Sequence, residues 1–159
     1  MNTPSLTLQP SGRATVRAIL AGGLIAGTID VGAAALINWI NPLFVLRFIA
    51  GGLLGKAALQ GGLPAAAWGM LLQWLMSLLI AAIFVIAALR LRWLTARPIL
   101  SGLAYGVVIY FVMNYVVMPL SAWHRVPPFR LLSFVENLVA MLVFGLIISF
   151  CARSALRRA

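Results

Sequence analysis

The stretch AILAGGLIAGTIDVGAAALINWI, residues 18–40, decides the fold class of this chain. It is almost wholly apolar, and a helix needs roughly 20 such residues to cross the hydrocarbon core of a bilayer. Asp30 lies near its middle, where a carboxylate costs roughly 2.5 to 3.5 kcal/mol on insertion scales. Asp30 therefore needs a partner, a proton or water, and it is the first candidate for a functional residue.

The composition of the whole chain also indicates a membrane protein. Of its 159 residues, 64% are hydrophobic and 9% are charged, and the mean hydropathy is +1.07. Soluble domains are roughly 45 to 50% apolar and about 25% charged. The net charge of +10 comes from basic residues at the ends of the apolar runs. We therefore expect contacts with anionic lipids and no binding of nucleic acid.

Three further segments, residues 65–89, 98–120 and 131–151, are also long and apolar enough to span a bilayer. We expect one transmembrane domain, an all-α bundle of four helices in two hairpins, with residues 1–12 as a mobile tail. Eight basic residues flank one side of the spans and four flank the other. By the positive-inside rule, this places both termini in the cytoplasm.

The segment PLFVLRFIAGGLLGKAALQGGLP, residues 42–64, connects the first two spans. It is too short and too rich in glycine to cross the bilayer, and too apolar for a free loop. At helical spacing its large apolar side chains fall broadly on one side. We predict that residues 43–60 form an interfacial or re-entrant helix on the outer face; the alternative is an apolar loop.

The two halves of the chain resemble each other. TVRAILAG at 15–22 and TARPILSG at 95–102 share five residues at an offset of 80, and the second and fourth spans align at an offset of 63. The pattern favours two hairpins that arose by duplication and are related by an axis along the membrane normal. Chance similarity between apolar helices is the alternative.

Small and polar residues recur about every four positions in each span. Lipid cannot satisfy polar side chains, so these stripes should face one another inside the bundle. Four glycines at this spacing are predicted helix-packing sites: Gly23, Gly27, Gly102 and Gly106. By depth along the helices, the polar groups predict a water-accessible cavity in the outer half of the bundle, with candidate residues Asp30, Asn38, Gln73, Ser77, Tyr110, Asn114, Glu136 and Asn137. His124 and Arg125 would lie at its mouth.

Asp30 and Glu136 are the only acidic residues of the chain. Since burial disfavours a charged carboxylate, Asp30 is a candidate proton-binding group. Alternatively, it is protonated and holds two helices together through a hydrogen bond. Glu136 either lines the cavity or pairs with Arg125 or Arg130 at the outer face. His124 is more simply an exposed loop residue than a ligand.

Motifs for enzymatic chemistry are missing from the sequence. There is no HExxH, CxxC or nucleophile elbow, and GGLLGK at 51–56 is no phosphate loop because Ala57 follows Lys56. A single cysteine and a single histidine do not complete a metal site. We expect no enzyme activity, no metal and no cofactor.

Three segments carry a resemblance to a known family: GTID at 27–30, IAGGLLGKAALQGG at 49–62 and FVMNYVVMPLSA at 111–122. Through them, and over most of its length, the chain resembles the YagU-like family of small bacterial inner-membrane proteins. The resemblance implies four spans and a bacterial inner membrane. It implies no reaction, no substrate and no catalytic residue.

Two hypotheses for function follow. In the first, a bundle that is oligomeric through its glycine faces binds or passes a proton, a cation or a small polar solute through a periplasm-facing cavity. In the second, an accessory or scaffold protein docks a membrane-protein partner or a lipid through its outer helix. Water reaches Asp30 in the first case, whereas Asp30 is dry in the second.

Overall fold

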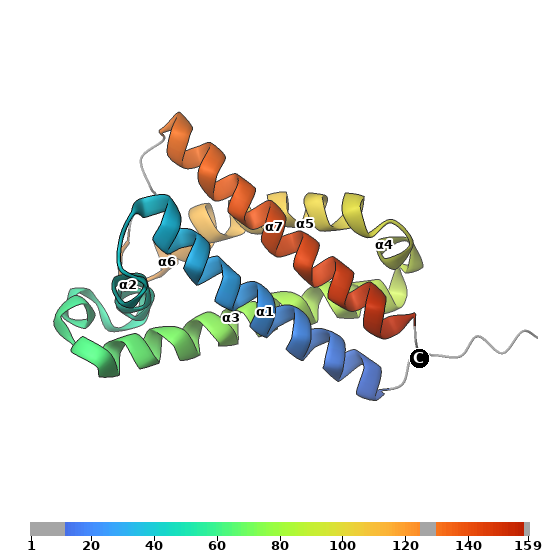
Figure 1. The fold of residues 1–159 in the computed structure, drawn as a ribbon, viewed down its shortest axis with the longest axis horizontal. Helices are drawn as coiled ribbons and strands as arrows, with labels where there is room; N and C mark the ends of the chain where they lie inside the picture. The colour runs from blue at the N-terminus through green and yellow to red at the C-terminus, as the bar shows by residue number, and fades with distance from the viewer. Residues whose placement is uncertain (1–11, 125–129, 158–159) are drawn as a thin grey trace, which may run out of the picture.

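Four long apolar helices build the fold (Figure 1). The computed structural model describes residues 12–124 and 130–157. Within this part of the chain four helical segments are long and apolar enough to cross a membrane, namely Gly12–Asn38, Gly62–Arg90, Pro98–Leu120 and Leu131–Leu156, and a shorter apolar helix, Pro42–Leu54, lies between the first two. The predicted all-α membrane fold with four spans is confirmed. The predicted tail lies outside the described residues, except for Gly12.

The long helices extend beyond the predicted spans. Helix α1 is Gly12–Asn38, α3 is Gly62–Arg90 and α7 is Leu131–Leu156. Hydropathy marks the part of a helix that lies in lipid, whereas backbone hydrogen bonding continues into the basic ends. Helix α1 ends before its predicted limit, because Trp39 adopts a left-handed conformation with φ 53°.

The third span contains a change of helix type. Helix α5, Pro98–Val112, continues into a π-helical turn, η2, at Met113–Val117 and then into the short helix α6, Met118–Leu120. Pro119 has no backbone N–H, and its ring clashes with the carbonyl four residues earlier. A wider turn directly before the proline accommodates both effects, and the N–H of Met118 donates to the carbonyl of Met113.

The predicted outer helix is present as α2, Pro42–Leu54, followed by a 3₁₀ turn, η1, at Lys56–Gln60. Asn41 caps α2 by accepting a hydrogen bond from the backbone N–H of Leu43 at 2.8 Å. Gly55 ends it with φ 75°, a conformation that glycine adopts without strain. In Figure 1 α2 is seen nearly end-on, so it runs across the bundle and not along it.

Both predicted hairpins are formed, α1 with α3 and α5 with α7. Between the hairpins, α1 packs along α7, whereas α3 and α5 make hardly any close backbone approach. Tyr105 fills the space between α3 and α5: its hydroxyl donates to the carbonyl of Ile80 at 2.7 Å, and its ring lies 5.0 Å from that of Phe84. A two-fold axis would make the two pairings alike, so the helix contacts do not follow the axis predicted from the repeat.

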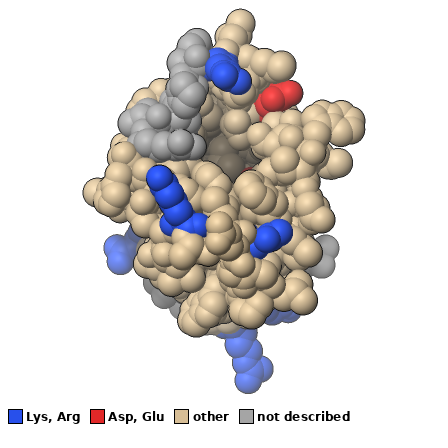
Figure 2. Space-filling view, turned by 90° about the vertical axis from the view of Figure 1, so that its left-hand side faces the viewer, with Lys and Arg blue, Asp and Glu red and all other residues tan. Residues whose placement is uncertain are grey.

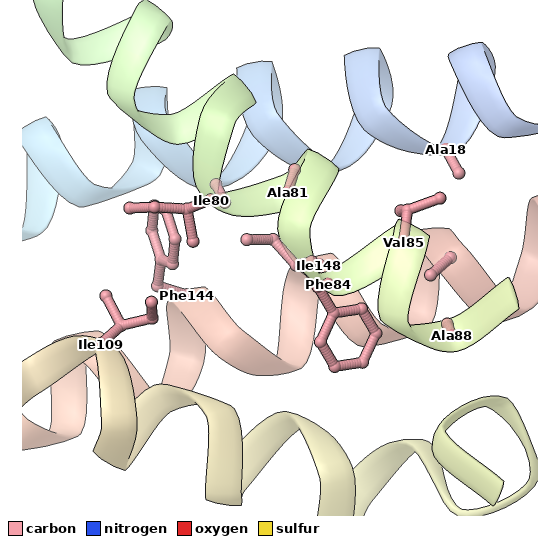
Figure 3. Packing of buried hydrophobic residues seen from close by; sticks show 11 residues of the cluster. Ala18, Ile80, Ala81, Phe84, Val85, Ala88, Ile109, Phe144 and Ile148 are labelled. Carbon is pink, nitrogen blue, oxygen red and sulfur yellow. The ribbon is translucent and has the colours of Figure 1, made fainter. Parts of the chain in front are cut away.

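The main core occupies the half of the bundle that ends at α4, Arg92–Ala96. All four long helices contribute side chains to it (Figure 3), namely Ala18, Ala26, Ile80, Ala81, Phe84, Val85, Ala88, Ile109, Phe144, Ile148 and Ala152. Phenylalanine and isoleucine side chains fill the space that the alanines leave, which gives dense packing. This core closes the bundle at the α4 end.

Candidate functional site

The two hairpins separate toward the end that carries α2. Near the α4 end, Gly22 of α1 lies against Ile148 and Cys151 of α7. Farther along, residues 26–37 of α1 and 135–144 of α7 form the walls of a cavity of about 340 Å³. The cavity therefore begins where the contact between α1 and α7 ends.

Helix α1 stays in contact with α3 along this opening. A Cβ atom on Gly23 would lie 2.8 Å from Cα of Leu78, and Gly27 lies directly against Ser77. Because small residues let two backbones approach closely, these glycines hold the hairpin together.

Asp30 lies one turn farther along α1, at the same interface with α3. Nε2 of Gln73 donates to Oδ2 of Asp30 at 2.8 Å and to the carbonyl of Gly27 at 3.3 Å. Beside it, Nε1 of Trp74 donates to Oγ1 of Thr28 at 3.1 Å. Side-chain hydrogen bonds therefore take over from glycine packing where the hairpin approaches its open end.

Helix α5 stays in contact with α7 in a similar way. Gly102 packs against Gly145, and Gly106 packs against the backbone of Met141 and Leu142. Toward the α2 end, the rings of Tyr110 and Phe134 meet edge to face at 5.3 Å. All four glycines predicted as packing sites thus lie in contacts within a hairpin.

The cavity between the hairpins is apolar apart from its two acids. The described residues that line it are Ala26, Ile29, Asp30, Ala33, Ile37, Val135, Glu136, Val139, Ala140, Val143 and Phe144. Ile29 and Val139 line the cavity and are also 47% and 52% exposed. The cavity therefore opens sideways onto the apolar surface of the bundle.

Three of the predicted polar residues lie around this cavity, and the others are separate. Asp30 and Glu136 line it, and Gln73 binds Asp30. Ser77 is buried at the contact with Gly27, and Tyr110 is buried beside α7.

Each of the three candidate asparagines donates to the carbonyl four residues earlier in its own helix. Asn38 donates to Ala34 at 2.8 Å, Asn114 to Tyr110 at 2.9 Å and Asn137 to Ser133 at 2.7 Å. A helix can satisfy such side chains by itself, so a polar residue at regular spacing does not have to face another helix. These three asparagines do not join Asp30.

The predicted mouth is described only in part. His124 is exposed in the loop after α6, with φ 46°, and Arg125 lies outside the described residues. Within the described part of the chain Glu136 has no ion pair, so no bridge to Arg130 forms there. Among the same residues there is no group of three His, Cys, Asp or Glu side chains that could hold a metal ion.

A second cavity, of about 260 Å³, lies beneath α2. It is lined by Phe48, Ile49, Gly52, Leu53, Leu72, Gln73, Met76, Met113, Val117, Met118, Ser121 and Trp123. Gln73 belongs to this cavity and Asp30 to the first, so their hydrogen bond joins the walls of the two.

Trp123 fixes α2 over the second cavity. Its ring stacks on Phe48 at 4.6 Å, and its Nε1 donates to the carbonyl of Phe48 at 3.2 Å. The N–H of Ala122 donates to the carbonyl of Gly52 at 2.8 Å. This contact was not predictable from the sequence, because it joins residues far apart in the chain and no local spacing marks it.

The apolar walls of the first cavity were also missed. Ala26, Ala33 and Ile37 lie four residues before and three and seven after Asp30. This is the spacing of one helix face, so the face of Asp30 could have been found from the sequence. The face of α7 that lies opposite could not have been found in this way.

The α2 end of the molecule is hollowed, with basic side chains around it and an acidic side chain at the edge of the hollow (Figure 2). In the described sequence, the basic residues at this end are Arg47, Lys56 and Arg130. The α4 end carries Arg13, Arg17, Arg90, Arg92, Arg97, Arg153 and Arg157. The positive charge is thus larger at the closed end.

Comparison with known proteins gives no family for this chain. No protein-family model, no curated protein and no solved structure matches it. The resemblance to the YagU-like family rests on the three quoted segments alone, and no residue role comes from a relative. The chain has the architecture of a multi-pass membrane protein with four apolar helices.

Proposed function

We propose that this protein binds a proton or a cation at Asp30 and passes it along the opening between its two hairpins. One observation carries the proposal: the only two acidic residues of the chain line the same cavity. Acidic side chains within a membrane span are expensive and commonly mark ion or proton pathways.

The surroundings of Asp30 support binding of a positive charge. Its hydrogen bond comes from the neutral amide of Gln73 and engages Oδ2, so it orients the carboxyl group without neutralising it. Oδ1 remains on the same carboxyl to carry a proton or contact a cation. The alternative, in which Asp30 only joins two helices, uses the same hydrogen bond and predicts no flux.

The lining argues against a small polar solute. Apart from Asp30 and Glu136, the cavity offers only apolar side chains. A polar solute would lose its hydrogen bonds to water without replacement, at a cost of about 1 to 3 kcal/mol for each group. We therefore restrict the proposal to a proton or a cation.

The proposal includes an orientation. Among the described residues seven arginines lie at the closed α4 end and three basic residues at the α2 end, so the positive-inside rule favours a cytoplasmic α4 end and termini. In a bacterial inner membrane the cavity then faces the periplasm. Anionic lipids would bind at the basic ends. The four packing glycines are occupied within the chain, so an oligomer would have to use another surface.

A second candidate function is docking of a lipid or a membrane-protein partner on α2. The observation that favours it is the exposure of Leu43, Phe44, Leu53 and Leu54 on this helix. In that case charged substitutions at Phe44 and Leu53 would abolish partner capture or lipid binding, and a substitution at Asp30 would not.

Flux in proteoliposomes tests the main proposal. Under a proton or cation gradient we expect flux with the wild type and its loss in Asp30→Asn. Asn137→Ala is the matched control, because Asn137 is an exposed polar residue of a span that bonds to its own helix. If wild type and Asp30→Asn carry the same flux, or neither carries any, the transport proposal fails.

A further inference from the structure

The shape and lining of the cavity between α1 and α7 point to a class of ligand. Its volume of about 340 Å³ lies at the lower end of the roughly 300 to 1,000 Å³ of sites for organic ligands. A bare metal ion needs much less space and several oxygen ligands. Nine of the eleven described lining residues are apolar, so the walls fit an apolar body.

The charged residues of the lining favour a positively charged ligand. Asp30 and Glu136 line the cavity, and no Lys, Arg or His is among the described lining residues. An anion would meet like charges there, whereas a cation can pair with the two carboxyl groups beside the apolar surface. Phe144 adds an aromatic ring at the inner part of the cavity, where a ring can also contact an organic cation.

The two acids lie at different depths. On α1 Asp30 is one turn from Ala26, the innermost lining residue, whereas on α7 Glu136 is next to Val135, the outermost. A ligand that enters from the α2 end or from the side meets Glu136 near the opening and Asp30 farther in. Gln73 holds Asp30 in place by its hydrogen bond at 2.8 Å.

The side opening suits a ligand that is dissolved in the bilayer. Ile29, Val135, Val139 and Val143 line the cavity and are also exposed on the outside of the bundle. In a membrane this surface faces acyl chains, so a molecule with an apolar body can reach the cavity without crossing water. An inorganic ion has no such route, because the hydrocarbon excludes it.

We propose that this cavity binds an amphipathic organic cation, with its charged amine, ammonium or phosphonium centre at Asp30 and its apolar body against the α1 and α7 walls. The proposal rests on the proposed binding of a positive charge at Asp30 and names the class of cation.

A pair of ions with the same shape and opposite charge tests the proposal. Binding of tetraphenylphosphonium and tetraphenylborate is measured by isothermal titration to the full chain in lipid nanodiscs, with empty nanodiscs subtracted to remove partitioning into lipid. We expect protein-dependent binding of the cation only, weakened about tenfold or more in Asp30→Asn, as for loss of one partner of a charge pair. Equal binding of both ions, or no effect of Asp30→Asn, overturns the proposal.

A steric variant tests the position of the ligand while both acids remain. Ala140→Phe and, on the opposite wall, Ala33→Phe place a ring in the cavity, and we expect each to weaken cation binding at least as much as Asp30→Asn. Ala104→Phe is the matched control, because Ala104 is exposed on α5 and lines neither cavity. Helical circular dichroism checks the fold. If both wall variants bind the cation as the wild type does, the proposal is wrong.

The two proposals can fail separately. Proton flux that depends on Asp30, without binding of tetraphenylphosphonium, leaves the proposed function standing and overturns this inference. Binding of the cation that depends on Asp30, without flux of any ion, supports the ligand class and overturns transport.

Discussion

The two ends of the bundle are built on different principles. At the α4 end, the four long helices share one dense apolar core, and Gly22 brings α1 directly onto α7. At the α2 end, each hairpin holds together by itself, and the space between them is a cavity with two acids. Contact between the hairpins at this end passes through α2 and Trp123, which follows α6. The difference teaches that the closed end supplies stability, so that the open end can hold two acidic residues beside a cavity.

The same substitution should change stability in opposite directions at a packed contact within a hairpin and at an uncrowded position of α1 near the open end. A Cβ on Gly106 would lie 2.8 Å from Cα of Leu142, whereas a Cβ on Gly32 meets nothing within 4 Å. We expect Gly106→Ala to lower the free energy of unfolding by about 2 kcal/mol through overpacking against backbone. Gly32→Ala should raise it by up to about 1 kcal/mol through helix propensity.

Unfolding by SDS titration in mixed micelles, followed by circular dichroism, measures both variants. If Gly32→Ala lowers the free energy of unfolding as much as Gly106→Ala does, the open end is as tightly packed as the hairpins. The comparison between the two ends would then be wrong.

Trp123 should hold the open end without supporting the core. Trp123→Ala removes the stacking on Phe48 and the hydrogen bond to its carbonyl, with an expected loss of about 1 to 3 kcal/mol at this contact. Amide hydrogen exchange should become faster in α2 and stay unchanged around Ile148. Trp123→Phe keeps the stacking and loses the hydrogen bond. Its exchange rate in α2 should therefore lie between those of the wild type and Trp123→Ala. Faster exchange at Ile148 in Trp123→Ala would show that the two ends are coupled.

The smallest effect is expected at the hydrogen bond between Gln73 and Asp30. Such bonds inside membranes average about 0.6 kcal/mol in double-mutant cycles. We expect Gln73→Leu, Asp30→Leu and the double variant to give a coupling of that size in the same SDS titration. The control is the same cycle with Asn114→Leu in place of Gln73→Leu, since Asn114 bonds to its own helix. No coupling between Gln73 and Asp30 would mean that the amide does not orient the carboxyl group.

The fold was predictable from the sequence because the bilayer imposes it. A run such as residues 18–40 has one stable solution in lipid, a helix, and four such runs give the bundle. The outer helix was predictable from the amphipathic pattern of its apolar residues. The exact ends of the helices were not predictable, since hydropathy does not report where backbone hydrogen bonding stops.

The candidate site was predictable only in part. Asp30 stands out by charge alone, and its partner Gln73 lies at a similar predicted depth. Asn38, Asn114 and Asn137 do not line the cavity with Asp30, and each bonds within its own helix. The second wall of the cavity depends on how far α7 diverges from α1. This divergence results from packing between the hairpins, and no periodic pattern of residues in the sequence marks it.

The length of the helices makes membrane thickness a variable for this protein. Helix α3 has 29 residues, about 43 Å at 1.5 Å per residue, and the hydrocarbon core of a bilayer is about 30 Å thick. A helix of this length tilts or extends beyond the lipid core, and a thinner bilayer favours more tilt. Because α1 and α7 pack closely at the α4 end and diverge toward the α2 end, more tilt would separate these two helices further beside the cavity. We therefore expect the width of the opening beside Asp30 to change with the thickness of the bilayer around the protein.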